Sequence, residues 1–368
     1  MLVPDDIVAL SKYYGSNPGY VIAGGGNTSY KEDDRLWIKA SGVSLANIDE
    51  SGFVCLSRKK LDKISEAIYS IDPVIREEEV KRDLMAAIID DKTKRPSVET
   101  SLHNLFNYSY VVHTHPTAVN ALLCSVDVKN VTKELFGTKV MFVEYTDPGY
   151  TLFRKTKEEL NKYTGIYDKE PETIFLQNHG MIVCSENAGD IYPLTDRTIE
   201  AVSSRFKQKL PSLDFIVPRR SSQMLINRVN EYLGSRNLVS AYSSNKLIEI
   251  FVQGSKDFRR ISRPFTPDNV VYCKSEYLLS GGSAEKVIRD VEAFEDRFGF
   301  FPALIALEAI GLISTGINKQ NANRALEVFQ DMMKISFLSD NFGGPVFLTK
   351  EQTEFIDNWE VENYRRRI

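Results

Sequence analysis

Two short apolar runs separated by only four residues constrain the fold of this chain more than any other feature of its sequence. The runs occupy residues 174–176 and 181–184, and the sequence between them is Gln-Asn-His-Gly. This pattern predicts two β-strands joined by a tight, partly polar turn. A helical pattern near residues 188–208 follows. The sequence therefore predicts a strand–turn–strand–helix unit whose turn carries a histidine.

Strand-like and helical patterns also alternate through the first half of the chain. Runs at residues 20–23, 35–40 and 52–56 predict short strands, the first two on either side of a glycine-rich turn. Apolar residues recur every three or four positions in 59–69 and 76–90, which predicts surface helices. The predicted fold class is therefore α/β or α+β, with a central, mostly antiparallel sheet flanked by helices.

A change in sequence character near residue 210 predicts a domain boundary. Residues 209–222 contain two prolines and have no helical period, as is typical of linkers. A chain of 368 residues is also expected to form about two domains. We therefore expect a first domain over residues 1–210, a linker over 211–222 and a C-terminal α/β lobe over 223–368.

Two segments of the C-terminal lobe resemble segments of the first domain. Residues 270–274 align with 111–115, and residues 306–314 align with 175–183. Under this alignment the three histidines of the first domain are replaced by Tyr272, Lys274 and Ile310. Either the lobe is a degenerate copy without a metal site, or two strand–turn–strand–helix units resemble each other by chance.

Histidine is rare in this chain, so the positions of its four histidines are informative. His113 and His115 are two residues apart at the end of a β-branched run that begins at Tyr110. Alternate residues of a strand project to the same face, so both imidazoles can reach one metal ion. Catalytic zinc sites usually have three protein ligands, and His179 in the turn is the candidate for the third. We predict a site for Zn²⁺ or another divalent metal formed by these three residues.

The segment before this strand contains a candidate base. Ser97 follows Pro96 and precedes an amphipathic pattern, which predicts that Ser97 is the N-cap of a helix. Glu99 then lies in the first helical turn, where its carboxylate can face the metal site. The helix dipole alone also favours glutamate at this position. His103 lies four residues later on the same face, and we interpret it as a packing residue or as support for the metal ligands.

A loop over residues 24–29, Gly-Gly-Gly-Asn-Thr-Ser, is suited to bind a phosphate. It combines backbone N–H groups with an amide and hydroxyls, although a plain β-turn also explains the glycines. Helix N-termini add further donors. The candidate phosphate-binding residues are Gly26, Asn27, Thr28, Ser41, Gly42 and Ser97. The loop lacks the helix and acidic residue that complete a dinucleotide-binding fingerprint.

Charge and cysteine content argue against several classes of partner. The chain has 46 Lys and Arg against 50 Asp and Glu, a net charge of −4, and no basic block. It therefore gives no electrostatic reason to bind nucleic acid or a membrane surface. The four cysteines are far apart, residues 1–6 lack the pattern of a signal peptide, and no apolar run is long enough to span a bilayer. We expect a cytoplasmic protein with buried thiols and small-molecule partners.

The order of the motifs resembles that of the class II aldolase/adducin family, which includes the L-fuculose- and L-rhamnulose-1-phosphate aldolases. The motifs are Gly-Gly-Asn-Thr-Ser, Ala-Ser-Gly, Pro-Ser-x-Glu, His-Thr-His-Pro and Gln-Asn-His-Gly, and they lie between about residues 15 and 205. Residues 342–345 and 357–364 are similar to the aldolase segment of longer bacterial proteins that join a rhamnulose-phosphate aldolase to a short-chain dehydrogenase. No counterpart of the dehydrogenase part occurs before Ile368.

The resemblance implies roles for individual residues. It implies that His113, His115 and His179 bind zinc and that Glu99 is the catalytic acid/base. It also implies that four residues contact the substrate phosphate or its neighbouring oxygens, namely Asn27, Ser41, Gly42 and Ser97. Tyr145 resembles a tyrosine that assists proton transfer. Val98 stands where many members have a second serine, so either the phosphate site is rebuilt or the substrate is unusual. Many members are oligomers, and we expect a homo-oligomer.

The reaction of the aldolases explains this set of residues. Cleavage of a ketose 1-phosphate between C3 and C4 leaves negative charge on the enediolate of dihydroxyacetone phosphate, which a divalent cation stabilises as a Lewis acid. The resemblance implies that in the synthetic direction Glu99 removes the C3 proton and that Tyr145 protonates the aldehyde oxygen.

Two alternatives remain. One is a pentulose-5-phosphate 4-epimerase of the same family, and the other is a non-catalytic, adducin-like assembly module. The retained histidines and Glu99 argue against the module, because a protein without catalysis does not need to hold them together. The fusion-like C-terminal region favours the aldolase over the epimerase.

Overall fold

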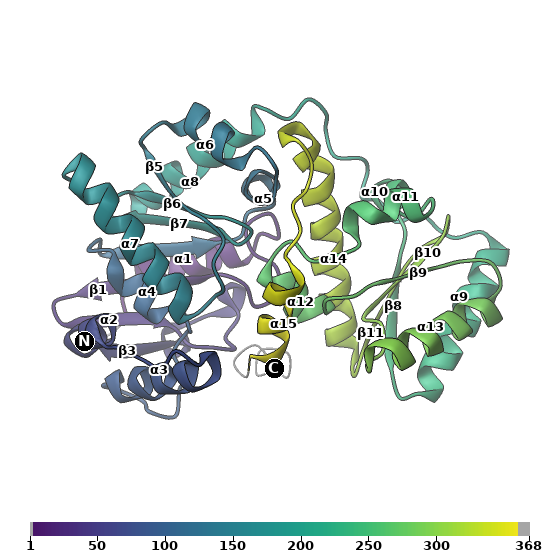
Figure 1. Ribbon diagram of the computed structural model, residues 1–368, viewed down its shortest axis with the longest axis horizontal. Helices are drawn as coiled ribbons and strands as arrows, with labels where there is room; N and C mark the ends of the chain where they lie inside the picture. The colour runs from purple at the N-terminus through teal and green to yellow at the C-terminus, as the bar shows by residue number, and fades with distance from the viewer. Residues whose placement is uncertain (1–2, 360–368) are drawn as a thin grey trace. The chain divides into compact units, whose positions relative to one another are not determined.

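The computed structural model of the protein describes residues 3–359 and divides into two compact units (Figure 1). Among the described residues, the first unit comprises 3–123, 127–205 and Trp359, and the second comprises 124–126 and 206–358. Residues 206–219 contain neither helix nor strand. The first unit thus ends five residues before the domain end that the sequence predicts.

The first unit is built on a seven-stranded sheet with the strand order β3-β2-β1-β4-β7-β6-β5. Its strands are β1 (Asn27–Glu32), β2 (Arg35–Lys39), β3 (Phe53–Ser57), β4 (Tyr110–Thr114), β5 (Val140–Val143), β6 (Thr173–Leu176) and β7 (Gly180–Ser185). All neighbouring pairs are antiparallel except β5 and β6, which are parallel. The predicted α/β class with a mostly antiparallel sheet is confirmed.

Helices cover both faces of this sheet. They are α1 (Asp5–Gly15), α2 (Arg58–Glu66), α3 (Pro73–Ala87), α4 (Thr100–Leu105), α5 (Thr117–Leu123), α6 (Val128–Phe136), α7 (Tyr150–Tyr167) and α8 (Ala188–Ser203). Apolar side chains of α2, α3, α4 and α7 pack on one face. Helices α1, α5 and α8 contact β1 and β7 from the other. The core therefore consists of two apolar layers that enclose the sheet.

The expected strand at residues 20–23 is absent, and this prediction is wrong. Residues 20–26 form turns and extended chain, and the strand β1 begins only at Asn27. The sequence of β1, Asn-Thr-Ser-Tyr-Lys-Glu, has low strand propensity, but β1 pairs with β2 on one side and β4 on the other. Pairing in the middle of a sheet outweighs intrinsic preference.

The polar residues of β1 are tolerated because each one finds a partner. Asn27, Ser29 and Lys31 alternate along the strand and therefore face the same side. The Ser29 hydroxyl lies 2.8 Å from Nδ1 of His103, and Lys31 Nζ donates to the carbonyl of Tyr108 at 2.8 Å. The apolar environment lowers the pKa of Lys31 to about 7, so Lys31 carries a large desolvation cost when it is protonated.

Lys31→Met is expected to change how stability depends on pH. An unfolded lysine has a pKa of about 10.4, so between pH 7 and that value the unfolded wild type binds more protons than the folded form, and its free energy of unfolding rises with pH. The variant lacks this contribution, so its stability relative to the wild type is greatest at pH 7 and below and falls as the pH rises. Urea unfolding of both proteins at several pH values measures this, and a pH-independent difference contradicts it.

The second unit contains a four-stranded sheet with the order β8-β11-β10-β9. Its strands are β8 (Val239–Ser243), β9 (Leu278–Ser280), β10 (Leu304–Leu307) and β11 (Gly311–Gly316). Its helices are α9 (Arg220–Ser235), α10 (Lys246–Phe251), α11 (Ser255–Phe258), α12 (Pro267–Cys273), α13 (Ala284–Phe298), α14 (Lys319–Ser339) and α15 (Lys350–Asn358). Helices α9 and α13 pack against the sheet in one apolar cluster, and α14 also contacts β8 and β11.

This small sheet has the same strand connections as half of the first sheet. The order β8-β11-β10-β9 corresponds to β4-β7-β6-β5, and in both cases only the last pair is parallel. In both units a long helix precedes the hairpin and another follows it. The register is also equivalent, because Tyr242 pairs with Ile313 as His113 pairs with Ile182.

The two hairpin turns share their backbone geometry as well. Asn178 and Ala309 occupy the same turn position and have φ values of 53° and 56°. In the first turn the N–H of His179 donates to the carbonyl of Leu176 at 3.1 Å. In the second turn the N–H of Ile310 donates to the carbonyl of Leu307 at 3.0 Å. The predicted alignment of 306–314 with 175–183 therefore agrees with the structure at this turn.

The other predicted alignment is wrong. Residues 270–273 belong to α12 and form no strand, so they cannot correspond to the strand before His113. Thr266 and Asn269 form a capping box and Pro267 occupies the first turn, which together favour a helix start over the strand preference of Val270 and Val271. The strand equivalent to β4 is β8.

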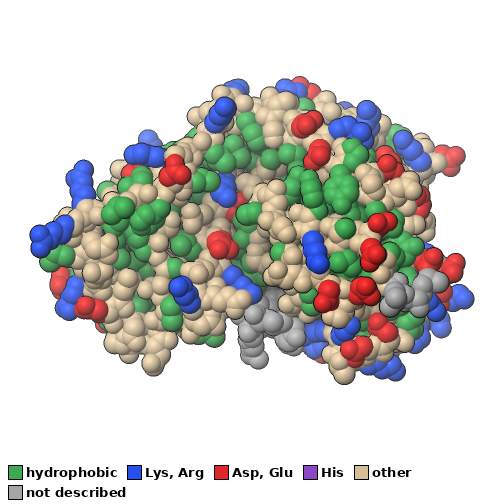
Figure 2. Space-filling view, turned by 180° about the vertical axis from the view of Figure 1, so that it is seen from behind, with side chains coloured by type: hydrophobic (Ala, Val, Ile, Leu, Met, Phe, Trp, Pro, Cys, Tyr) green, Lys and Arg blue, Asp and Glu red, His purple; other side chains and the backbone are tan. Residues whose placement is uncertain are grey.

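The surface agrees with the charge composition. Figure 2 shows Lys and Arg side chains interspersed with Asp and Glu over the visible face, without a field of one sign. All four cysteines are buried free thiols, as predicted. Within residues 3–359, the helices are too short or too polar to cross a bilayer.

Candidate metal centre

Strand pairing brings two of the predicted metal ligands to one end of the sheet. His113 is near the end of β4, where it pairs with Asn27 of β1 on one side and Ile182 of β7 on the other. His115 follows directly after β4, and its N–H donates to the carbonyl of Tyr20 at 3.0 Å. The alternation of the strand directs both rings to the face covered by α4.

His179 completes the group from the turn between β6 and β7. One ligand nitrogen from each of His113, His115 and His179 lies within 4.8 Å of the other two. Nε2 of His113 and Nε2 of His115 are 2.9 Å apart. His113 is fully buried and His179 is 8% exposed. The structure therefore brings together all three predicted ligands.

A backbone contact orients the His113 ring, and a side-chain amide holds the turn that carries His179. Nδ1 of His113 lies 3.0 Å from the carbonyl of Met181, so Nδ1–H donates there and the Nε2 lone pair is directed at the other two rings. Asn120 Nδ2 donates to the carbonyl of His179 at 3.2 Å. Burial, followed by the neighbouring imidazoles, lowers the pKa of His113 well below its usual value. A neutral imidazole is the form that ligates metals, and a set of three imidazoles fits a catalytic Zn²⁺ site.

Gly180 leaves room for the histidine rings. A Cβ at this position would lie 2.5 Å from the carbonyl oxygen of Thr114 and 2.6 Å from Cδ2 of His115. Gly180→Ala is therefore expected to lower the free energy of unfolding by about 1–3 kcal/mol through overpacking, and to weaken metal binding because His115 must move. Gly165→Ala in α7, where nothing lies within 4 Å, is the control. Thermal unfolding with and without metal measures both effects, and equal behaviour of the two variants contradicts the prediction.

The carboxylate of Glu99 lies beside the three rings. Its Oε1 is 3.7 Å from Nε2 of His113 and 3.5 Å from Nε2 of His179. Its Oε2 accepts a hydrogen bond of 2.6 Å from Asn27 Nδ2, and the residue is 7% exposed. Glu99 therefore presents one oxygen to the metal centre while Asn27 holds the other.

The local structure around Glu99 differs from the predicted helix start. Helix α4 begins at Thr100, and Glu99 rather than Ser97 occupies the N-cap position. The Ser97 hydroxyl accepts a hydrogen bond from the Glu99 N–H at 3.2 Å and lies 3.4 Å from Oδ1 of Asn27. Ser97 and Glu99 thus form a turn before the helix, because the hydroxyl bonds two residues ahead rather than to the third N–H of a helix.

Three other predicted phosphate-binding residues lie in two places, the Ser41–Gly42 turn and the segment before β1 that contains Gly26. The N–H of Ser41 donates to the carbonyl of Arg95 at 2.8 Å, which places the Ser41–Gly42 turn beside the strand-like segment before Ser97. Gly26 has a φ of 67°, and a Cβ there would lie 2.8 Å from the carbonyl oxygen of His113, so it allows close approach to β4.

Thr28 and Val98 have structural roles in this fold. The Thr28 hydroxyl lies 2.6 Å from the hydroxyl of Ser11 in α1, and strand alternation directs it to the opposite face from Asn27. The structure therefore does not bring Thr28 to the metal centre. Val98 lines a small, largely apolar cavity together with Tyr150 and Trp359, so its side chain has a packing role here.

Tyr145 lies in the loop between β5 and α7. Its N–H donates to Oε1 of Gln177, in the turn that carries His179, at 3.2 Å. Its hydroxyl lies 3.5 Å from Oδ1 of Asp147. Burial, followed by the charge of Asp147, raises the pKa of Tyr145, so the phenol is protonated at neutral pH. This hydrogen bond ties Tyr145 to the turn, and its hydroxyl bonds to Asp147 rather than to Glu99 or the metal-ligating rings.

His103 is held apart from the metal centre. Its ring is fully buried, its Nδ1 contacts Ser29, and desolvation lowers its pKa to about 3. Its backbone N–H donates to the carbonyl of Glu99 at 2.9 Å. The interpretation of His103 as a packing and supporting residue therefore fits its contacts.

Three groups that support the site were not predicted from the sequence. They are the carbonyl of Met181, the amide of Asn120 and the left-handed backbone of Asn178. Asn178 had a detectable signal, because asparagine adopts positive φ more readily than other non-glycine residues. The other two contributions depend on register and helix docking, which local patterns do not determine.

Comparison with known proteins gives a family match and two curated relatives. The sequence profile described as "Class II Aldolase and Adducin N-terminal domain" matches residues 5–202. "Uncharacterized oxidoreductase YuxG" of Bacillus subtilis is 22% identical over 98% of the chain, which spans 58% of the length of that relative. "L-fuculose phosphate aldolase" of Methanocaldococcus jannaschii is 26% identical over 47% of the chain and 79% of its own length.

Two solved structures each match about half of the chain. The N-terminal class II aldolase domain of a conserved protein from Thermoplasma acidophilum is 27% identical, with a TM-score of 0.44, over 54% of the chain and 90% of that domain. An L-fuculose 1-phosphate aldolase is 15% identical, with a TM-score of 0.36, over 55% of the chain and 86% of that protein.

Proposed function

The chain belongs to the class II aldolase and adducin family, and on that premise we propose that it is a metal-dependent aldolase. In the proposed reaction a ketose 1-phosphate of the rhamnulose-1-phosphate type is cleaved reversibly to dihydroxyacetone phosphate and an aldehyde. The observation that carries the proposal is the buried carboxylate of Glu99 beside three clustered histidines.

His113, His115 and His179 would hold the divalent cation, for which we propose Zn²⁺. When bound, it supplies Lewis-acid stabilisation of the negative charge that develops on the dihydroxyacetone phosphate part of the substrate. The enclosed position of His113 and His179 strengthens such electrostatic interactions because little water screens them.

Glu99 is proposed to move the proton at C3. In cleavage the C3–C4 bond breaks, the C4 hydroxyl loses its proton as the aldehyde forms, and Glu99 delivers a proton to C3. In synthesis Glu99 removes that proton again. The hydrogen bond from Asn27 to Oε2 leaves Oε1 oriented towards the histidines, so Asn27 is a positioning residue for this step.

Tyr145 is proposed as the acid/base at the C4 oxygen. Its protonated phenol suits the role of an acid towards the aldehyde oxygen during synthesis, and its attachment to Gln177 places it near the turn of His179. For the substrate phosphate we propose contacts with Gly26, Asn27, Ser41, Gly42 and Ser97. A homo-oligomer remains part of the proposal.

We further propose that the second unit is a degenerate copy of the part of the first unit that carries the histidines. The equivalent strands and hairpin turns support this relationship. Tyr242 and Ile310 take the places of His113 and His179, and the Tyr242 hydroxyl donates to the carbonyl of Ile310 at 3.0 Å. The second unit therefore is expected to bind no catalytic metal.

The proposed activity is tested with metal-loaded protein and three substrates, rhamnulose 1-phosphate, fuculose 1-phosphate and ribulose 5-phosphate. Release of dihydroxyacetone phosphate from a ketose 1-phosphate is the expected result. Epimer formation from ribulose 5-phosphate without such release would instead identify an epimerase. No reaction with any substrate, together with no bound metal, would contradict an enzymatic function and leave the assembly module.

A further inference from the structure

A second cavity in the first unit lies at the opposite end of the sheet from the histidines. It has a volume of about 590 Å³, which is within the range of small-molecule sites. Tyr108, just before β4, and Thr173, the first residue of β6, line it. His113 and His115 lie at the other end of β4, and His179 follows the other end of β6, so the cavity is separate from the metal centre.

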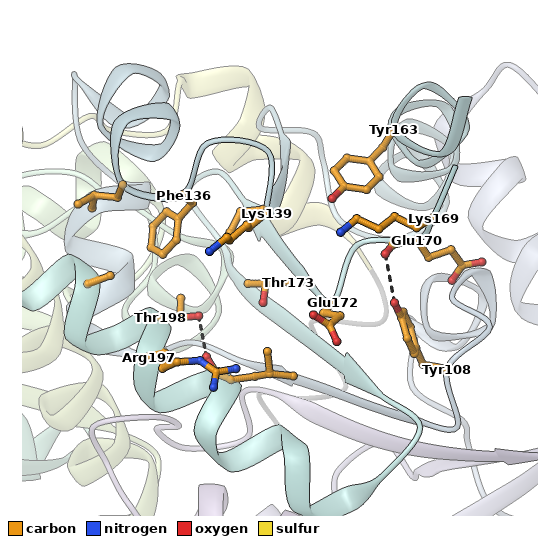
Figure 3. Close-up of a pocket in the computed structure, with 14 residues that line it drawn as sticks. Tyr108, Phe136, Lys139, Tyr163, Lys169, Glu170, Glu172, Thr173, Arg197 and Thr198 are labelled. Carbon is orange, nitrogen blue, oxygen red and sulfur yellow. Dashed lines mark hydrogen bonds between the residues drawn. The ribbon is translucent and has the colours of Figure 1, made fainter. Parts of the chain in front are cut away.

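Three cationic side chains from three different segments line this cavity. Lys139 lies between α6 and β5, Lys169 lies between α7 and β6, and Arg197 lies in α8. Figure 3 shows the three side chains around one open space. Within residues 3–359 none of them forms an ion pair or side-chain hydrogen bond. No direct ion pair within the described residues therefore neutralises their positive charges.

The carboxylates around the cavity compensate only part of this charge. Both oxygens of Glu170 accept hydrogen bonds from Asn107, one from its backbone N–H and one from its side-chain amide. This carboxylate is therefore already occupied by Asn107. Glu172 is the acidic residue directed at the open space in Figure 3. Three cations and one carboxylate give a local charge of about +2. This charge balances the charge of about −2 that a phosphate monoester carries at neutral pH.

The rest of the lining suits the polyhydroxylated part of such a ligand. Glu172 and the hydroxyl of Thr173 are acceptors for ligand hydroxyl groups. The rings of Tyr108, Phe136 and Tyr163 provide apolar surface. The Tyr108 and Tyr163 hydroxyls donate to the carbonyls of Glu170 and Thr138, so these rings are fixed before any ligand binds.

From this arrangement we propose that the cavity is a second ligand site that binds a phosphorylated, polyhydroxylated metabolite through Lys139, Lys169 and Arg197. The site is formed from residues of one unit and does not depend on the proposed aldol reaction. The cavity lies at the starts of β4 and β6, whereas the metal centre lies at their other ends. A ligand of the cavity therefore binds at a different place from any substrate of the metal centre.

The test is calorimetric titration of the full chain with glucose 6-phosphate, which is neither a ketose 1-phosphate nor a pentulose 5-phosphate. We expect Arg197→Ala and Lys169→Ala each to weaken binding at least tenfold, since each removes a charge-assisted hydrogen bond to the phosphate. Lys133→Ala is the matched control, because Lys133 is a lysine in the last turn of α6 that does not line the cavity. Ser97→Ala is the control for the metal centre, and both controls should bind within twofold of the wild type.

Three results would overturn the proposal. The first is no binding of glucose 6-phosphate to the wild type at millimolar concentration. The second is binding that Ser97→Ala weakens and Arg197→Ala does not, which would locate it at the metal centre. The third is equally tight binding of gluconate, which would show that the phosphate is not what the cations recognise. Lys169 and Arg197 are exposed, so their variants are expected to fold, and circular dichroism verifies this.

Discussion

Replacing Glu99 by glutamine is expected to lower the turnover number by about 10²- to 10⁴-fold while the protein keeps its metal. A positioned general base contributes this much to a rate, and glutamine has the same shape but cannot accept the proton. The three histidine ligands are unchanged, so metal content per chain should equal that of the wild type. Steady-state kinetics and elemental analysis of the same preparation separate the two effects.

The control for this variant is a second Glu-to-Gln replacement away from the site. Glu186 bonds Ser109 just before β4, at the far end of that strand from the histidines. Glu186→Gln is expected to keep turnover within about twofold. Asn27→Ala should fall between the two, because it removes the hydrogen bond that orients the carboxylate. Full activity of Glu99→Gln would refute its assignment as the base.

His115→Ala is expected to remove the metal and the activity together. Loss of one of three ligands should weaken metal binding by more than about 100-fold, since even partners outside the ligand set contribute about 10- to 100-fold. His115 is the least buried of the three ligands, so its truncation disturbs the core least. Dialysis against a metal buffer followed by elemental analysis should give one ion per wild-type chain and none for the variant.

His103→Gln provides the matched comparison for this experiment. His103 is a buried histidine on the adjacent helix, and its contact is with Ser29. The variant should retain one ion per chain, because the residue it changes contacts Ser29 and is not one of the three ligands. Two ions per wild-type chain would contradict the proposal that the second unit has lost its metal site.

The parts of this fold that were predictable from sequence are those with strong local signals. The hairpin that carries His179 was predictable because two apolar runs enclose a short polar turn. The pair His113 and His115 was predictable because a period of two on a strand directs both rings to one face. These two local patterns were sufficient to propose the metal ligands, although not their distances.

The parts that were not predictable depend on contacts between distant segments. Strand β1 has a polar sequence and becomes a strand because it pairs with β2 and β4. The same pairing brings Asn27 to Glu99, 72 positions later in the chain. The Gly-rich motif suggested a phosphate-binding role for Asn27, and the structure adds its hydrogen bond to the carboxylate of Glu99, which the motif did not indicate.

Helix α12 illustrates a different limit. Two valines and a tyrosine suggested a strand, but the residues before them supply a capping box and a proline in the first turn. Capping residues at the N-terminus of a helix can outweigh the strand preference of a short β-branched run, because they satisfy several backbone N–H groups at once. The capping box of Thr266 and Asn269 is thus the local signal that identifies this segment as a helix.

The central claim is that Glu99 exchanges the C3 proton of dihydroxyacetone phosphate at this metal centre, and it can be measured without knowing the aldehyde. Metal-loaded protein is incubated with dihydroxyacetone phosphate in D₂O, and deuterium at C3 is followed by proton NMR. Incorporation at C3 by the wild type, abolished by a chelator and by Glu99→Gln, is the predicted result. A wild-type protein that binds metal but leaves the C3 protons unexchanged would contradict the account.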